Sequence, residues 1–519
     1  MGCRIDRPGP AGPRLGRYRV DTDQPPVPSL PAMVNRSTVR TSLVAGLVVA
    51  AVALALGRSQ PDRSGHGEER LNTRLVGRHD LQGRSAYQPL PVRQGERRIL
   101  YVGHHAGEAL NPLTGAVEPN GTSVVDVTAA DTPVLLAHIP PTGGARGAQM
   151  VQVCEGDRLP DGEAGRFYLL RSNGNRSHEL WDVSEPARPG FLRTVVETGR
   201  TPAGAQHTHK NWWECDTGVA HLVGTVDGWR APRVLQVFDL ADPAAPRHVR
   251  DFSLPGVQPD AAGPVPGGSG VHEAVVLGNR VYLAYGTSAE GAVQILDREK
   301  LLRGDPEAAA PLASSPEALA YPEVGRLDLP SFWGGHTAMP LLDVAIPDYA
   351  GNRDHATRDF LFVVSESVGN ACQETRHVTL MLDITDEAHP LPISTFQVPE
   401  SSGGFCTRGG RFGPHAPQWS MEPPYYGKLM VVSWFNAGAR VIDVRDPFDL
   451  REVAYYIPAT TERTDERCAT IDGVETCRVA IQTNNVEVDD RGLIYLVDRA
   501  NTGLHVVELT GPAAAIIID

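Results

Sequence analysis

The stretch TSVVDVTAADTPVLLAHI, which begins at Thr122, is a β-branched run ending in Asp126, then a turn containing Pro133, then a second extended run. The same pattern recurs along the chain as HELWDVSEPARPGFLRTV from His178, LQVFDLADPAAPRHVRDF from Leu235, VQILDREK from Val293, VTLMLDITDEAHPLPISTF from Val378, ARVIDVRDPFDLREVAYY from Ala439 and LHVVELTGP from Leu504. The acidic position is occupied by Asp126, Asp182, Asp239, Asp297, Asp383, Asp443 and Glu508. We interpret this acid as a turn cap between two strands rather than as a calcium ligand.

Another strand, rich in β-branched and aromatic residues, precedes each copy, as in RRILYVG from Arg97. A further short segment lies before that strand. Seven units of four strands are typical of an all-β fold, a seven-bladed β-propeller of four-stranded antiparallel blades, here over residues 74–519. The content of 53 Gly and 43 Pro suits many turns and disfavours a helical bundle.

The ends of the repeat region indicate how the ring closes. The last unit has no convincing outer strand, whereas RLVGRHDL from Arg74 lies upstream of the first unit and resembles one. We therefore predict that Arg74–Leu81 pairs with Leu504–Leu509 and closes the ring, with residues 58–73 as a linker. The alternative is that Arg74–Leu81 is also linker.

The repeats VVDVTAADTPVLL and RVIDVRDPFDLREVA resemble those of the LVIVD-repeat family, β-propellers found mostly in exported or surface-attached bacterial proteins. The resemblance covers nearly everything from Arg74 to Pro512. It implies the architecture strongly and the chemistry weakly, because a fold hosts functions through its sites.

An apolar stretch near the N-terminus indicates export. Residues 41–57, TSLVAGLVVAAVALALG, follow Arg36 and Arg40 as an apolar core follows a positive region. Residues 33–57 are expected to form a cleaved signal peptide or an uncleaved membrane anchor. Residues 1–32 are expected to be a leader without fold, with Met33 as an alternative start. The expected location is extracytoplasmic: periplasmic, cell-surface or secreted.

Six cysteines follow the leader, an even number that suits three disulfides in an exported chain. We predict the pairs Cys154–Cys215, Cys372–Cys406 and Cys468–Cys477. Free buried thiols are the alternative.

Composition and motifs exclude several functions. The net charge is −14, and the part of the chain after the basic N-terminal stretch is more acidic still, which disfavours nucleic-acid binding. No nucleophile elbow, HExxH, P-loop or dinucleotide motif is present. We expect a monomer that meets a membrane only through its N-terminal segment.

Histidines recur where the innermost strand of a blade begins. The segments AQHTHKNW, GVHEAVV, GGHTAMP and GPHAPQW occupy this position in four successive units. Such side chains should converge on the central channel, where neutral imidazoles suit Cu, Fe or Zn. The candidate ligands are His207, His209, His272, His336 and His415, of which only one from the first pair is needed. A wet polar channel is the alternative.

Other polar residues are expected at the same face, where they would hydrogen-bond to the ligand imidazoles or bind substrate. These are Gln88, Gln149, Glu273, Glu366, Asn485, His104 and His105.

A ring of inner-strand histidines is similar in architecture to the propellers of selenium-binding proteins and methanethiol oxidases and of carotenoid cleavage oxygenases. The similarity implies a transition metal, with Cu or Fe favoured over Zn, and an oxidase or oxygenase acting on a small molecule, although no catalytic residue is identified. The alternative is a non-catalytic surface propeller that binds a protein or polysaccharide through its loops, including the insertions at 301–330 and 400–413.

Overall fold

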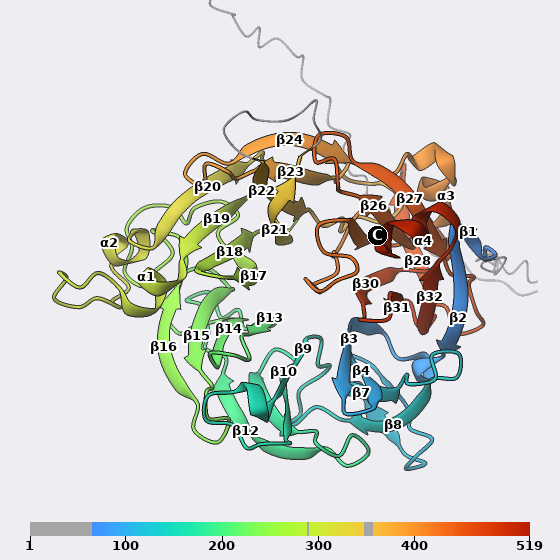
Figure 1. Ribbon diagram of the computed structural model, residues 1–519, viewed down its shortest axis with the longest axis horizontal. Helices are drawn as coiled ribbons and strands as arrows, with labels where there is room; N and C mark the ends of the chain where they lie inside the picture. Colours follow the sequence, from blue (N-terminus) through green and yellow to red (C-terminus); the bar gives the residue numbers. More distant parts are fainter. Residues whose placement is uncertain (1–64, 288–289, 347–355, 519) are drawn as a thin grey trace, which may run out of the picture. The chain divides into compact units, whose positions relative to one another are not determined.

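The computed structural model describes residues 65–287, 290–346 and 356–518. Within the unit Arg58–Asp519, the strands form seven four-stranded antiparallel sheets around a centre, which confirms the seven-bladed β-propeller (Figure 1). The unit Met1–Gly57, with the expected leader and signal peptide or anchor, lies outside the described residues. In the part of the chain that the structure describes, no helix is long and apolar enough to cross a membrane.

Each of the first five blades is a meander of four strands in chain order, with a separate hairpin inserted after the second strand of blade 1. Blade 1 contains β3 (Ala86–Gln94), β4 (Arg97–His104), β7 (Thr122–Asp126) and β8 (Val134–Ile139). Blade 2 contains β9 (Val151–Glu155), β10 (Phe167–Asn173), β11 (Ser177–Asp182) and β12 (Gly190–Glu197). Blade 3 contains β13 (Thr208–Trp213), β14 (Val219–Gly224), β15 (Val234–Asp239) and β16 (Arg247–Phe252). Blade 4 contains β17 (Val271–Leu277), β18 (Arg280–Tyr285), β19 (Gly291–Asp297) and β20 (Glu323–Leu329). Blade 5 contains β21 (Thr337–Ala345), β22 (Thr357–Val364), β23 (Thr379–Asp383) and β24 (Leu391–Phe396).

The last two blades each take a strand from the N-terminal part of the chain. Blade 6 contains β25 (Leu429–Ser433), β26 (Ala439–Asp443), β27 (Arg451–Ile457) and β1 (Glu69–Leu71). Blade 7 contains β30 (Thr483–Val488), β31 (Leu493–Asp498), β32 (Leu504–Leu509) and β2 (Thr73–His79).

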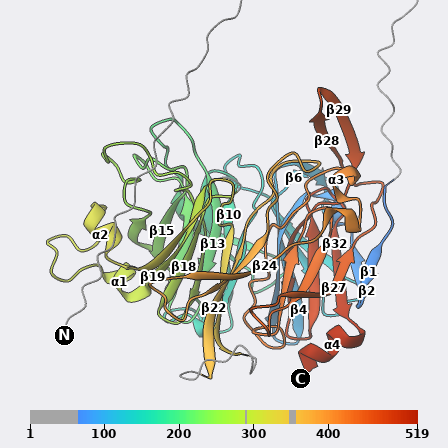
Figure 2. The same cartoon turned by 90° about the horizontal axis from the view of Figure 1, so that it is seen from above.

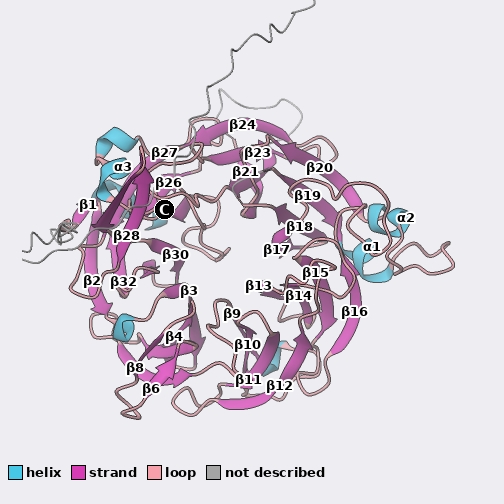
Figure 3. Cartoon of the chain, turned by 180° about the vertical axis from the view of Figure 1, so that it is seen from behind, coloured by secondary structure: helices cyan, strands magenta, loops and turns pink. Residues whose placement is uncertain are grey.

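Small elements decorate the blades, and most helices lie at the periphery (Figure 3). Two hairpins are formed by β5 (Glu108–Leu110) with β6 (Val117–Pro119), and by β28 (Glu466–Ile471) with β29 (Val474–Val479). The helices are α1 (Arg298–Arg303), α2 (Pro316–Ala320), α3 (Phe405–Arg408) and α4 (Gly511–Ile518), with single 3-10 turns η1 (Leu81–Gly83), η2 (Gly156–Arg158) and η4 (Glu400–Ser402).

Ring closure follows the prediction. Strand β2 is antiparallel to β32, with Arg74 opposite Glu508, and ends at His79 before the turn at Leu81. The segment expected as a linker also contributes, because β1 pairs with β27 in the neighbouring blade. The N-terminal chain thus covers the outer edges of two adjacent blades, edges that would otherwise be open to pairing with other chains.

Blade 6 departs from the regular pattern at its inner edge. The segment around His415 was expected as its innermost strand, yet it is not a regular strand and joins β25 through the bridge Pro417–Val432. Backbone hydrogen bonds at 2.9 Å still hold it in place, including those from the amides of His415 and Gln418. Pro414 and Pro417 lack amide hydrogens, so a continuous ladder cannot form here.

Five of the six repeated aspartates cap turns, as expected, whereas Asp297 caps the first turn of helix α1. Asp126 Oδ1 accepts the amide of Thr128 at 2.9 Å, and Asp182 and Asp239 each accept the amide two residues on at the same distance. The second oxygen of Asp126 pairs with Arg97 of the preceding strand. The acid therefore ties the turn to the blade.

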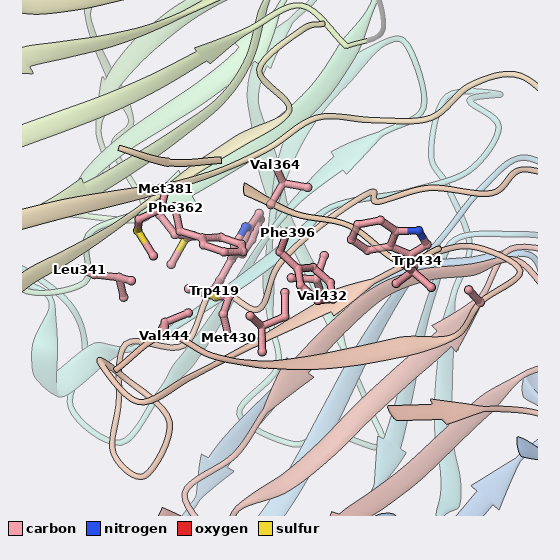
Figure 4. Packing of buried hydrophobic residues seen from close by; sticks show 14 of the residues in the cluster. Leu341, Phe362, Val364, Met381, Phe396, Trp419, Met430, Val432, Trp434 and Val444 are labelled. Carbon is pink, nitrogen blue, oxygen red and sulfur yellow. The ribbon is translucent and has the colours of Figure 1, made fainter. Parts of the chain in front are cut away.

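Side chains alternate along the strands, so the apolar faces of neighbouring blades pack together. Figure 4 shows one such core between blades 5 and 6, to which Phe362, Met381 and Met430 belong and in which Phe396 packs edge-on against Trp434 at 5.6 Å. These residues are buried. The ring is therefore stabilised by contacts between blades that do not depend on the channel.

All three predicted disulfides are present, and they link Cys154 to Cys215, Cys372 to Cys406 and Cys468 to Cys477. The last one crosses the hairpin β28–β29, which projects from one side of the blades (Figure 2). Three disulfides are consistent with an extracellular location.

Candidate metal centre

Four histidines meet where the inner strands of blades 3 to 6 begin. They are His209 in β13, His272 in β17, His336 directly before β21, and His415 in the inner segment of blade 6. Neighbouring rings lie in series, with centroid distances of 4.5, 4.0 and 4.5 Å. All four are buried. Antiparallel meanders that all start at one face bring these distant positions together.

Register shifts in the inner strands affect the direction in which several of these side chains point. The register of β13 against β14 shifts between Thr208 and Asn211, where His209 lies. The register of β17 shifts around His272, and that of β30 shifts around Asn484. Such bulges break simple alternation and can turn a side chain toward a site.

Hydrogen bonds fix the proton positions on two of the rings. His272 Nδ1 lies 2.9 Å from the carbonyl oxygen of His336, and His415 Nδ1 lies 2.5 Å from that of Asn484. A carbonyl only accepts, so each Nδ1 carries a hydrogen and donates it. In the neutral imidazole the Nε2 atom of each ring then carries a lone pair, and that of His272 faces Nε2 of His209 at 2.9 Å.

A hydroxyl group orients the third ring. Thr337 Oγ1 donates to the carboxylate of Glu273, so it accepts from His336 Nδ1 at 2.7 Å. Nε2 of His336 therefore also carries a lone pair, and this buried atom has no hydrogen-bond partner within the described residues. Hydrogen bonds on the outer nitrogen are typical of histidines that bind metals.

The fourth ring, His209, contacts both the cluster and a tyrosine. Its Nε2 atom lies 2.9 Å from Nε2 of His272 and 3.4 Å from the hydroxyl of Tyr87. The Tyr87 ring also packs edge-on against His415 and His105. Tyr87 thus stands beside the four histidines on the side of blade 1.

Two carboxylates lie next to the histidines. Glu366 has one oxygen 3.8 Å from His415 Nε2 and the other 4.0 Å from His272 Nε2, and it pairs with Arg411 at 3.1 Å. Glu273 faces the buried Lys210, whose Nζ is 3.6 Å away. Ligand atoms of His272, Glu273 and His336 lie within 4.8 Å of one another, as do those of His336, Glu366 and His415.

The electrostatics keep the imidazoles neutral. Burial lowers the pKa of all four histidines well below the usual value. The charge of Lys210 lowers each of these pKa values further, and that of Arg233 does so for His209, His272 and His336. Burial also lowers the pKa of Lys210 and raises that of Glu273. The cluster therefore presents uncharged nitrogen donors at neutral pH.

Of the five predicted ligands, His207 is not in this cluster. It is half-buried, and its backbone amide donates to Thr225 at 2.8 Å while its ring contacts none of the four histidines. The bulge at His209 explains why the two do not act as equivalent neighbours on one strand face.

Of the other predicted polar residues, His104 lies away from the histidine cluster, whereas His105 lies close to it. His105 lies beside Tyr87 and accepts from Gln149 Nε2 at 2.8 Å, so its Nδ1 lone pair is already used. Gln88 accepts from Asn485 Nδ2 at 2.5 Å. His104 lies away from the cluster, because its Nε2 meets Ser123 Oγ inside blade 1 at 2.8 Å.

Sequence reasoning missed several residues of the site. Tyr87, Lys210, Thr337 and Arg411 all contact the histidines or their partners. Each lies within four residues of an inner-strand position already singled out, at Gln88, His209, His336 and His415. Their closeness in sequence to these inner-strand positions was therefore the signal that could have identified them.

Comparisons with known proteins concern the fold alone. No protein-family model matches the sequence, and no curated protein matches it. The β-propeller domain of Cps50 (Swd1) from Myceliophteria thermophila is similar with a TM-score of 0.42 and 11% identity, over 85% of this chain and 100% of that chain. Sqt1 from Chaetomium thermophilum has a TM-score of 0.46 and 12% identity, over the same shares of the two chains. Both are far too distant in sequence to inform the site, and the LVIVD resemblance has no support from a family model.

Proposed function

We propose that His209, His272, His336 and His415 bind one divalent transition-metal ion, and that the protein is an exported oxidase or oxygenase acting on a small molecule. The observation that carries this proposal is the set of Nε2 lone pairs left by the outer hydrogen bonds of three rings. Neutral imidazoles with a bound outer nitrogen are the ligands such ions prefer.

The spacing of the donors supports one shared ion. Two nitrogens at about 2.1 Å from one ion lie about 3.0–3.4 Å apart for bond angles of about 90–110°. The Nε2 atoms of His209 and His272 are 2.9 Å apart, close to this range. His336 Nε2 has no other partner among the described residues.

The donor set favours Cu or Fe over structural Zn. No thiolate is near, because the six cysteines of the described chain form disulfides. A structural zinc site usually includes cysteines, whereas histidine-rich sites with an open position suit redox metals. Such an ion would supply one-electron chemistry with oxygen, and the protein would supply a dry, neutral ligand set.

The test is metal content after expression in an oxidising compartment. Wild-type protein should hold about one Cu or Fe per chain by elemental analysis, with nitrogen ligands in its X-ray absorption spectrum. His336→Ala should lose this metal while keeping its circular dichroism spectrum. His178→Ala removes another fully buried histidine, outside the cluster, and should keep the metal. Full metal retention in His336→Ala contradicts the proposal.

A second candidate is a surface propeller that binds a protein or polysaccharide through its loops. One observation favours it: the hairpin β28–β29 projects from the blades (Figure 2). Its side chains Ile471 and Val474 are 38% and 64% accessible. Its disulfide between Cys468 and Cys477 holds this tip in one shape. Wild-type protein without metal would make this candidate the better one.

A further inference from the structure

Positive charge exceeds negative charge around the four histidines. Lys210 faces Glu273, and Arg411 pairs with Glu366. Two further arginines, Arg233 and Arg499, also act on the cluster. Within residues 65–287, 290–346 and 356–518, the guanidinium groups of these two arginines make no hydrogen bond or ion pair. A divalent ion at the histidines would raise the excess further.

The chain path places the arginines at the histidine face. Arg233 directly precedes β15, and Arg499 directly follows β31. These points lie at the same ends of the blades as the starts of the inner strands, because neighbouring strands are antiparallel. Arg411 lies four residues before His415 on the chain.

A cavity opens beside Arg499. Its volume is about 520 Å³, and its lining includes Arg499, Arg467, Arg146, His105 and Gln149. This volume lies within the range that small-molecule sites occupy. His105 connects the cavity to the cluster, because its ring lies 4.9 Å from that of Tyr87, which in turn contacts His209.

Arg233 and Arg499 are half-buried, and a half-buried cation without a protein partner is well placed to meet an anion. Arginine is suited to this task, since its planar fork binds a carboxylate through two parallel hydrogen bonds. Asp465 and Glu108 also line the cavity, but Asp465 already faces Arg467 at 3.7 Å. Of the arginines that line the cavity, Arg499 is the one whose charge acts on both His105 and His415.

We propose that the substrate of this site is a small organic carboxylate, bound through its carboxylate group by Arg499, with Arg233 and Arg411 adding positive potential. This inference rests on the proposed function and names its substrate class. The uncharged part of the molecule would extend toward His105 and Tyr87, beside the histidines.

The test compares matched charged and neutral probes on the metal-loaded protein. Benzoate and benzamide have the same shape, and isothermal titration calorimetry measures both. Wild-type protein should bind benzoate about tenfold or more tightly than benzamide. Arg499→Gln should remove this preference. Arg93→Gln is the matched control, because Arg93 lines a separate cavity whose lining shares no residue with the first, and it should leave the preference unchanged.

Metal content measured on the same samples distinguishes failure of the carboxylate inference from failure of the proposed function. Metal present with equal binding of benzoate and benzamide, or with an unchanged preference in Arg499→Gln, overturns the carboxylate inference alone. Absence of metal from wild-type protein overturns the proposed function, and with it the role of a carboxylate as substrate.

Discussion

Replacing Thr337 by valine tests the hydrogen bonds that prepare the histidines. Valine keeps the shape of threonine but removes the hydroxyl that accepts from His336 Nδ1 and donates to Glu273. Without it, nothing holds the imidazole hydrogen on Nδ1, and the tautomer with hydrogen on Nε2 blocks metal binding. Losing such an outer partner typically weakens metal affinity by about 10–100-fold, or about 1.4–2.7 kcal/mol.

The same change leaves the buried carboxyl of Glu273 with one partner fewer, which should lower the free energy of unfolding by about 1–3 kcal/mol. Thr483→Val is the matched control. Thr483 is also fully buried at the start of an inner strand, yet its Oγ1 has no hydrogen-bond partner in the described residues. Its replacement should leave metal affinity unchanged.

The assay is competition for the metal against a chelator of known affinity, followed by chemical unfolding of the metal-free proteins. The reasoning is refuted if Thr337→Val keeps wild-type affinity. It is refuted equally if Thr483→Val weakens binding by the same factor, because the effect would then come from the loss of any buried hydroxyl.

Two further predictions concern the fold. Truncation before Asp80 removes β1 and β2 and exposes the edges of β27 and β32. It should lower the unfolding midpoint in urea and promote association, which light scattering measures. A truncated protein that stays monomeric with an unchanged midpoint contradicts the closure argument. The free energy of unfolding of the metal-free protein should fall below pH 6.5, because the lowered pKa values keep the four histidines unprotonated in the folded state while the unfolded chain binds protons. The loss should be about 1.4 kcal/mol per pH unit for each histidine. Urea unfolding at pH 7.5 and 5.5 measures this difference, and equal stability at both values would show that the cluster is protonated or accessible to water.

The sequence was sufficient for the architecture because each blade repeats one local rule. An acid that caps a turn, as Asp126 does, must recur wherever a strand feeds the next one in the same way. Strand β2 could be predicted because the repeat requires four strands in each blade and the last blade lacked its outer one. Strand β1 could not, because three residues, Glu69–Leu71, carry no alternation to detect.

The site was less accessible to sequence reasoning, and the cause is backbone irregularity. Alternation places His207 and His209 on the same strand face, but the bulge in β13 brings only His209 to its partners. Prolines likewise prevent a regular inner strand at His415. Bulges depend on pairing between strands, so no single strand's sequence reveals them.

Burial of four neutral imidazoles in one place is the feature that a merely polar channel explains least well. Side chains lining a wet channel would meet water at their free nitrogens, whereas His336 Nε2 is buried without a hydrogen-bond partner in the described chain. An unsatisfied buried acceptor costs about 1–3 kcal/mol. The outer nitrogens of His272 and His415 are meanwhile bound to carbonyl oxygens, which leaves their Nε2 atoms as acceptors too. His209 Nε2 donates to only one of these acceptors, His272 Nε2 at 2.9 Å. A cation between the rings would attract the lone pairs of all of them.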